Sequence, residues 1–241
     1  MSLEFHTQML EHAQVLDGKD PNFGAEFNDI VQQLLSMEIY VQIGLTPKVR
    51  PMMAAAGEQP HIREYCPNDR KRFATDQSAR EWIGKHRIPL LALNPSSGLL
   101  VNDWLGPEIN TVIPEAPITT AFRTTEAGLA YARTLRQGKY PEFRLGLVMA
   151  RLLILTGLET GAEPHHLSLE TWGGNLRAVD VYEEAGFGLR GQRLDLEGRP
   201  TLHPVGDVIN GYEVFLHTDP KTGLTENRVF DTRCYYQYAG K

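Results

Sequence analysis

Cysteine is scarce in this sequence, since its 241 residues contain only Cys66 and Cys234. The two lie far apart and neither belongs to a C-x-x-C pair, so they do not supply the paired thiolates of a structural zinc site. Two cysteines in a chain of this length also exclude a disulfide scaffold. We therefore expect two reduced thiols in a cytoplasmic protein, and no metal.

Long apolar runs and an excess of basic charge are missing as well. No stretch approaches the roughly 18 apolar residues of a membrane-spanning helix, because Arg151 interrupts the most apolar segment. The N-terminus lacks a basic region followed by an apolar one, so no signal peptide is expected. The 24 Lys and Arg residues are outnumbered by 30 Asp and Glu residues, which argues against a broad nucleic-acid surface. The sequence thus predicts a cytoplasmic protein that binds neither membrane nor nucleic acid.

The composition that is present is typical of a globular protein, with 41% hydrophobic and 22% charged residues. Residues 1–59 differ from the rest of the chain. Two apolar patterns with helical spacing, one ending near Leu16 and one running from Phe27 to Tyr40, are followed there by Pro47 and Pro51. We expect a helical N-terminal extension and linker over 1–59, attached to a main domain over 60–241.

From residue 60 onward, strand-like and helical patterns alternate. Residues 129–136 fit either a strand or a helix. Strands are expected at 61–65, 88–93, 99–105, 118–123, 167–172, 187–196, 208–218 and 228–238, and helices at 69–86, 146–160 and 175–185. This order predicts an α/β (α+β) fold with a mixed sheet, in which a meander precedes the strongest helix and a βαβ-like unit follows it.

The most specific stretch of the sequence runs from Asn175 to Phe187. Asn175 is a good N-cap residue, Ala178 allows close approach, and Gly186 stands where a helix ends in a left-handed residue. By local physics alone this is a capped amphipathic helix between two strands. The same residues, with Tyr182, resemble the N-x-x-A-x-x-x-Y-x-x-x-G-F signature of the GNAT superfamily of N-acyltransferases. The resemblance covers roughly residues 61–238 and is specific over 141–187.

The segment 141–150, with the sequence PEFRLGLVMA, resembles the coenzyme-binding loop and helix of that superfamily. Its first four residues are similar and Gly146 falls within one residue of an expected glycine, but the second glycine is absent. Only close backbone approach demands glycine, and a helix N-terminus can still offer N–H groups to a pyrophosphate. The resemblance implies that acetyl-CoA is bound by Arg144, Leu145, Gly146, Leu147, Val148, Asn175 and Ala178.

A second registration of the coenzyme loop is open, at residues 123–130, with 131–145 as an insertion. We prefer 144–150, because the spacing from Gly146 to Asn175 then fits the superfamily without an insertion. A plain amphipathic core helix that binds no cofactor is the third interpretation of the same residues.

The resemblance implies transfer of an acetyl group from acetyl-CoA to a primary amine by direct attack in a ternary complex. Tyr182 matches the tyrosine that protonates the leaving sulfur. Glu170, on the preceding strand, is the candidate general base, and Glu126 and Asp103 are its rivals. The acceptor is expected to be a small-molecule or peptide amine. The alternative function, favoured by the missing loop glycine, is a catalytically inactive GNAT-like module that binds a ligand or a protein.

Two other motifs carry less weight. Residues 186–191 spell G-x-G-x-x-G, but a helix precedes them and a strand follows, which is the reverse of a dinucleotide site. His165 and His166 are adjacent, so on a strand they would point to opposite faces and could not easily share a metal ion. The N-terminal helices, the Pro-rich loop at 106–117 and the long C-terminal strands are candidate surfaces for acceptor access or for a homodimer.

Overall fold

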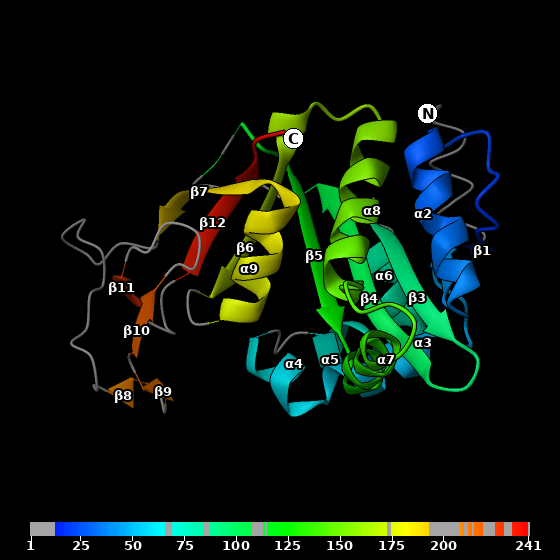
Figure 1. Cartoon of the computed structure of the whole chain (residues 1–241), viewed down its shortest axis with the longest axis horizontal. Helices are drawn as coiled ribbons and strands as arrows, with labels where there is room; N and C mark the ends of the chain where they lie inside the picture. Colours follow the sequence, from blue (N-terminus) through cyan, green and yellow to red (C-terminus); the bar gives the residue numbers. More distant parts are fainter. Residues whose placement is uncertain are drawn as a thin grey trace.

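The computed structural model describes residues 13–65, 69–83, 87–107, 113, 115–172, 175–192 and 233–240, and short strands between 208 and 228. The main sheet is built from β1 (Gln14–Val15), β2 (Tyr40–Ile43), β3 (Ile88–Asn94), β4 (Gly98–Pro107), β5 (Ile118–Thr124), β6 (Leu167–Trp172), β7 (Phe187–Gln192) and β12 (Arg233–Tyr238). The order across this eight-stranded sheet is β1-β2-β3-β4-β5-β6-β12-β7 (Figure 1). Its neighbouring strands are antiparallel except β5 and β6, which are parallel.

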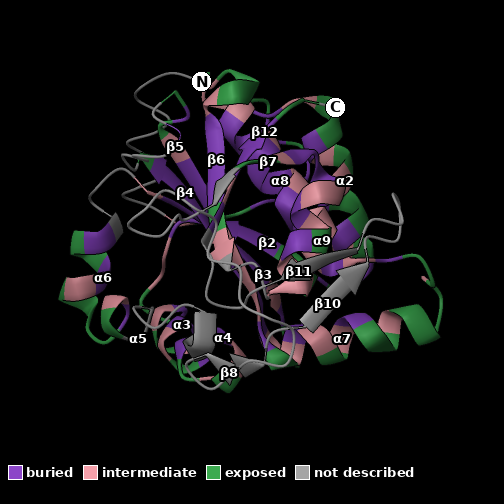
Figure 2. Cartoon of the chain, turned by 90° about the vertical axis from the view of Figure 1, so that its left-hand side faces the viewer, coloured by how far each residue is buried: buried purple, intermediate pink, exposed green. Residues whose placement is uncertain are grey.

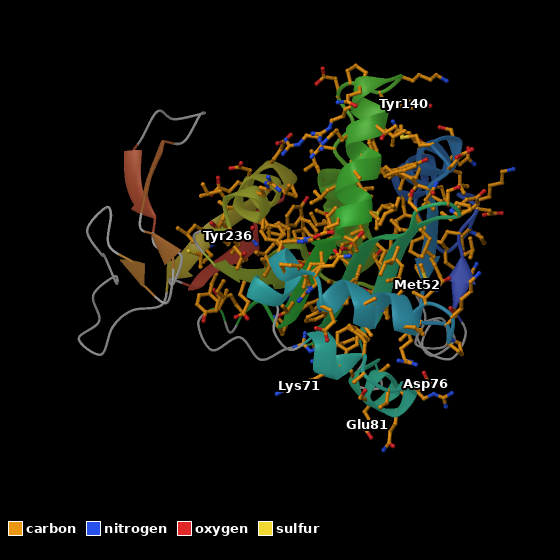
Figure 3. All side chains as sticks on the ribbon, turned by 90° about the horizontal axis from the view of Figure 1, so that it is seen from below. Met52, Lys71, Asp76, Glu81, Tyr140 and Tyr236 are labelled. Atoms are coloured by element: carbon orange, nitrogen blue, oxygen red, sulfur yellow. The ribbon has the colours of Figure 1, made fainter. Side chains whose placement is uncertain are left out.

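Helices cover both faces of the sheet. The helices are α2 (Ala25–Ser36), α3 (Arg50–Gly57), α4 (Pro60–Tyr65), α5 (Asp69–Arg72), α6 (Asp76–Ile83), α7 (Glu126–Gln137), α8 (Leu145–Glu159) and α9 (Leu176–Ala185). Apolar side chains of α2, α8 and α9 pack on one face, and those of α3, α4 and α6 pack on the other. Seen from below, the labelled Met52, Asp76 and Glu81 lie on the side of α3–α6 and Tyr140 lies on the opposite side (Figure 3). The sheet is therefore the middle layer, and β4 and β6 are coloured mainly as buried (Figure 2).

The helix α8 is the most apolar element, and its two charged residues, Arg151 and Glu159, both have structural roles. Arg151 donates from Nε to Glu26 Oε1 at 2.8 Å and from Nη1 to the hydroxyl of Tyr238 at 3.1 Å. At the far end of α8, the Glu159 carboxylate accepts from the Gly24 N–H at 2.9 Å. The contacts to Glu26 and Gly24 join α8 to the start of α2. None of the helices in the described ranges has the length and apolar run needed to cross a membrane.

The N-terminal segment departs from the expected helical extension. The second expected helix is present as α2, but the chain then turns at Glu38, whose φ is 58°, and Tyr40 begins a strand instead of ending the helix. Val41 and Ile43 are buried, and β2 pairs with both β1 and β3. The sheet therefore continues across the expected boundary between residues 59 and 60. The first expected helix lies mainly outside the described residues.

Three other expectations were wrong in part, and one open choice between strand and helix is settled. Residues 61–65 form α4 and not a strand, since Pro60 at its start suits a helix. Within the helix expected at 69–86 there are two short helices, α5 and α6, and residues 84–86 lie outside the described residues. The ambiguous 129–136 lies in α7, whose N-cap Thr125 accepts from the Gly128 N–H. At the C-terminus, in place of two long strands, β10 (Phe215–Thr218) pairs with β11 (Thr225–Arg228), β8 (Val208–Ile209) pairs with β9 (Tyr212–Glu213), and β12 inserts between β6 and β7.

The remaining core elements agree with the sequence patterns. The strands expected at 88–93, 118–123 and 167–172 are β3, β5 and β6, and the helices expected at 146–160 and 175–185 are α8 and α9. A meander of β2 to β5 precedes α8, and the parallel pair β5 and β6 is joined through it. The expected α/β fold with a mixed sheet is confirmed.

Candidate active site

The two parallel strands at the centre of the sheet separate soon after they meet. β5 and β6 are paired only at Ile118 with Leu167 and at Thr119 with Ser168, although β5 continues to Thr124 and β6 to Trp172. Figure 1 shows the two strands diverging toward their carboxyl ends. Backbone groups beyond the pairing point lose their ladder partners there, so they can bond a ligand placed between the strands.

The N-terminus of α8 lies beside this divergence. A Cβ on Gly146 would stand 3.5 Å from Phe122 Cε2, 3.8 Å from Thr124 Oγ1 and 3.8 Å from Val181 Cγ2, so the first turn contacts both β5 and α9. The N-cap residue is Arg144, and no side chain caps the helix. Because the first N–H groups of a helix have no intrahelical acceptor, this turn offers donors and a positive dipole end to an anion.

The N-terminus of α7, the second registration of the coenzyme loop, is closed in contrast. The Gly128 N–H donates to Thr125 Oγ1 at 3.0 Å, and the Glu126 N–H donates to Gln59 Oε1 at 2.9 Å. A Cβ on Gly128 would come within 2.2 Å of the Leu100 carbonyl oxygen. Close packing against β4 therefore requires a glycine at position 128, and this packing accounts for the glycine without a bound phosphate.

Five of the residues expected to hold the coenzyme, Arg144 to Val148, form the start of α8. Leu145 is buried in the core, Leu147 packs against the cluster under α9, and Val148 packs against the cluster under α2. These leucine and valine side chains thus point into the protein rather than toward a ligand on the backbone. Arg144 forms an ion pair with Glu184 of α9, and the two side chains are 40% and 37% exposed.

The signature residues of α9 take the local geometry expected of them, with one exception. Gly186 has φ 103° and ends the helix in the left-handed conformation. Asn175 occupies the N-cap position, but its side chain makes no capping hydrogen bond. Ala178 packs against the apolar cluster under α9. Tyr182 is 6% exposed, and its ring meets the Phe122 ring edge-on, with centroids 5.0 Å apart. The structure therefore brings Tyr182, Gly146 and Phe122 together where β5 and β6 separate.

Glu170 lies on the opposite face of the sheet from Tyr182. Leu167 and Leu169 of β6 share an apolar cluster with Tyr182, and the side chains of a strand alternate between faces. Glu170 is exposed and stands opposite Tyr235 of β12.

The two other candidate bases, Glu126 and Asp103, lie in different surroundings from Glu170. Glu126 is exposed at the start of α7, with its Oε1 4.0 Å from Nδ1 of His61. Asp103 of β4 is fully buried, opposite Leu90 and Phe122, and neither carboxylate oxygen has a hydrogen-bond partner. Burial raises the pKa of the Asp103 carboxyl well above the ordinary 3.8, and the nearby Arg123 lowers it only in part. Burial thus disfavours ionisation of Asp103, and its enclosed carboxyl is not placed to act as a base on an acceptor.

A group of polar residues on the face of Glu170 was not predicted from the sequence. Asn102 of β4 stands directly opposite Arg123 of β5, and Asn102 is 2% exposed with an Oδ1 that has no hydrogen-bond partner. The buried Nε1 of Trp104, on the same face, also has no partner. Only the register between β4 and β5 places these residues together, so no local motif could have found them.

The His165–His166 pair closes a turn. The Glu163 N–H donates to Nδ1 of His166 at 3.2 Å, and the two imidazole rings meet edge-on at 4.4 Å between centroids. Among the residues that the structure describes, no three His, Cys, Asp or Glu side chains gather in a way that could hold a metal ion.

No protein-family profile and no curated protein sequence matches this chain. Solved structures that are similar include a spermidine N-acetyltransferase from Vibrio cholerae in complex with CoA and spermine, at 16% identity and a TM-score of 0.46, covering 83% of this chain and 94% of that one. A ribosomal-protein-S5-alanine acetyltransferase from Vibrio fischeri is 10% identical with a TM-score of 0.48, covering 83% and 91%. An aminoglycoside N(6')-acetyltransferase from Legionella pneumophila is 16% identical with a TM-score of 0.42, covering 68% and 87%. The three similar structures are acetyltransferases, the kind of enzyme that the signature in the sequence resembles, and each covers two thirds or more of this chain.

Proposed function

We propose that the protein is a cytoplasmic N-acyltransferase that moves an acetyl group from acetyl-CoA to a primary amine by direct attack in a ternary complex. The observation that carries this proposal is the early separation of β5 and β6 beside the uncapped N-terminus of α8. A thioester needs a narrow site with backbone donors for its carbonyl, and its pyrophosphate needs N–H groups and positive charge. This region of the chain combines both.

The coenzyme fits the residues around the first turn of α8. The N–H groups of Leu145, Gly146 and Leu147 would face the pyrophosphate, while the side chains of Leu147 and Val148 stay in the core. Arg144 adds a guanidinium, which would exchange Glu184 for a phosphate oxygen. Asn175 and Ala178, at the start of α9, would flank the arm that leads to the thioester. The acetyl group then lies between β5 and β6.

Tyr182 and Glu170 would act from opposite faces of the sheet. In the proposed reaction the amine nitrogen bonds to the thioester carbon, the carbonyl oxygen becomes an oxyanion, and the carbon–sulfur bond then breaks. N–H groups at the end of β5 stabilise the oxyanion. The Tyr182 hydroxyl donates its proton to the leaving thiolate. Glu170 accepts the proton that the amine loses, because its side chain is exposed and an acceptor can reach it.

Two measurements on the full chain test the proposal. Binding of acetyl-CoA at about 1,000 times its Kd should add about 4 kcal/mol to the free energy of unfolding, seen as a thermal shift. Release of free CoA in the presence of a mixture of amines should then exceed its release without them. No thermal shift with either acetyl-CoA or CoA would refute the proposal.

A second function, a GNAT-like binding module without catalysis, is favoured by one observation. The Phe122 ring stands against both Tyr182 and Gly146, where a thioester would have to lie. A thermal shift with CoA, combined with no amine-dependent release of CoA across a broad set of amines, would support this second function over the first.

A further inference from the structure

The face of the sheet that carries Glu170 also carries a guanidinium on the other side of the strand divergence. Thr119 and Ser168 are paired, and side chains alternate along each strand, so Arg123 and Glu170 lie on the same face. Ala121, which stands between Thr119 and Arg123 on that face, packs against the cluster under α3–α6. Arg123 of β5 and Glu170 of β6 therefore stand on the same face, one on each side of the strand divergence.

Two neighbours of Arg123 on this face have buried polar atoms without a partner. Asn102 stands directly opposite Arg123 and is 2% exposed, yet its Oδ1 makes no hydrogen bond. The Nε1–H of Trp104, two residues farther along β4, is buried and has no acceptor. Buried polar groups without partners are rare in folded proteins and call for a ligand or water. An indole N–H only donates, so a ligand that completes it must accept. The Asn102 Oδ1 calls for a donor as it stands, and a half-turn of the amide would present its NH₂ to the same acceptor instead.

The distance between Arg123 and Glu170 suits a small acceptor with charge at both ends. Arg123 lies about 14 Å beyond the pairing point along β5, and Glu170 lies about 7 Å beyond it along β6. The long side chains of both residues can reach into the space between these positions. An ammonium group near Glu170 and an anion near Arg123 would each face a side chain of opposite charge. A polycationic amine would instead bring its second positive charge to Arg123.

We infer that the acceptor carries a carboxylate close to its amine, and that Arg123 and Asn102 bind this carboxylate while Glu170 faces the amine. This inference rests on the proposed function and names its substrate class: free amino acids or similar zwitterions. Arg123 is suited to the role because its planar guanidinium can bind a carboxylate in a bidentate way. Arg123 and Asn102 would act in binding and specificity, and not in the chemical step.

The test compares matched acceptors that differ only in the carboxylate. Amine-dependent release of CoA is measured with a panel of free L-amino acids, with their amides, and with spermidine and kanamycin. We expect at least one amino acid to exceed its own amide in kcat/KM by about 10-fold or more, the effect of a hydrogen bond to a charged group. Arg123→Gln should remove this preference by raising KM for the acid alone, and Arg123→Lys should keep part of it.

Arg133→Gln is the matched control, because it removes one exposed arginine from the outer surface of α7. It should leave the ratio of acid to amide unchanged. Thermal unfolding with and without acetyl-CoA shows that each variant is folded and binds the coenzyme. Equal or faster transfer to amides or polyamines in the wild type, or an unchanged ratio in Arg123→Gln, would overturn the carboxylate assignment and leave the acyltransferase standing. No transfer to any amine and no shift with acetyl-CoA would overturn both.

Discussion

The buried Asp103 should make the stability of this protein fall as the pH rises. Its carboxyl is fully enclosed on the face of the sheet under α8, without a hydrogen-bond partner for either oxygen. Burial raises its pKa well above the ordinary 3.8 in the folded chain. In the unfolded chain the carboxyl loses its proton near its ordinary pKa of about 3.9. Between these two pKa values, the folded state therefore holds a proton that the unfolded state has released.

Proton linkage gives the sign and size of the change in the free energy of unfolding. The free energy of unfolding is unaffected by this group below about pH 4, and then decreases by up to about 1.4 kcal/mol for each pH unit until the folded pKa is passed. Asp103→Asn keeps the size of the side chain and cannot ionise. The gain in stability of Asp103→Asn over the wild type should therefore grow by up to about 1.4 kcal/mol between pH 4.5 and pH 5.5.

Urea unfolding at closely spaced pH values, from 4.5 to 7.5, measures this difference. Asp180→Asn is the control, because it makes the same substitution at an exposed position on α9. Parallel stability curves for the wild type and Asp103→Asn would refute the reasoning. They would mean that the Asp103 carboxylate is ionised in the folded protein and is compensated there by another charge.

Three further outcomes are expected. In urea unfolding, Gly128→Ala should lower the free energy of unfolding by about 2 kcal/mol or more, because the added Cβ would collide with the Leu100 carbonyl. Gly188→Ala is the control, and it should change the free energy of unfolding by less than about 0.5 kcal/mol because the space around Gly188 is open. Arg151→Ala should cost about 1 kcal/mol by the same assay, since it removes the contacts to α2 and to the C-terminal strand, and an unchanged midpoint would contradict this. Tyr182→Phe should lower kcat by about 10-fold to 100-fold in steady-state assays while the thermal shift with acetyl-CoA stays the same, and equal loss of both would assign Tyr182 to binding.

Local patterns in the sequence were enough to predict the central elements of the fold. The apolar run over α8, the alternation in β3, β5 and β6, and the Gly186 end of α9 each follow from contacts within a few residues. Such features depend on helical and strand periodicity and on capping, and these act locally. The signature from Asn175 to Phe187 is of the same kind, which is why the resemblance to GNAT enzymes is visible in the sequence itself.

Other features depend on contacts between residues that are far apart in the sequence, and only the tertiary structure determined them. The strand at Tyr40 exists because β1 and β3 pair with it, although its residues also continue a helical pattern. Gln59 and Leu100, both distant in sequence, close the start of α7, whereas no side chain caps the start of α8. The register between β4 and β5 buried Asp103 on one face and set Asn102 opposite Arg123 on the other. Adjacent residues on a strand face opposite ways, so their roles could be separated only once the strands were paired.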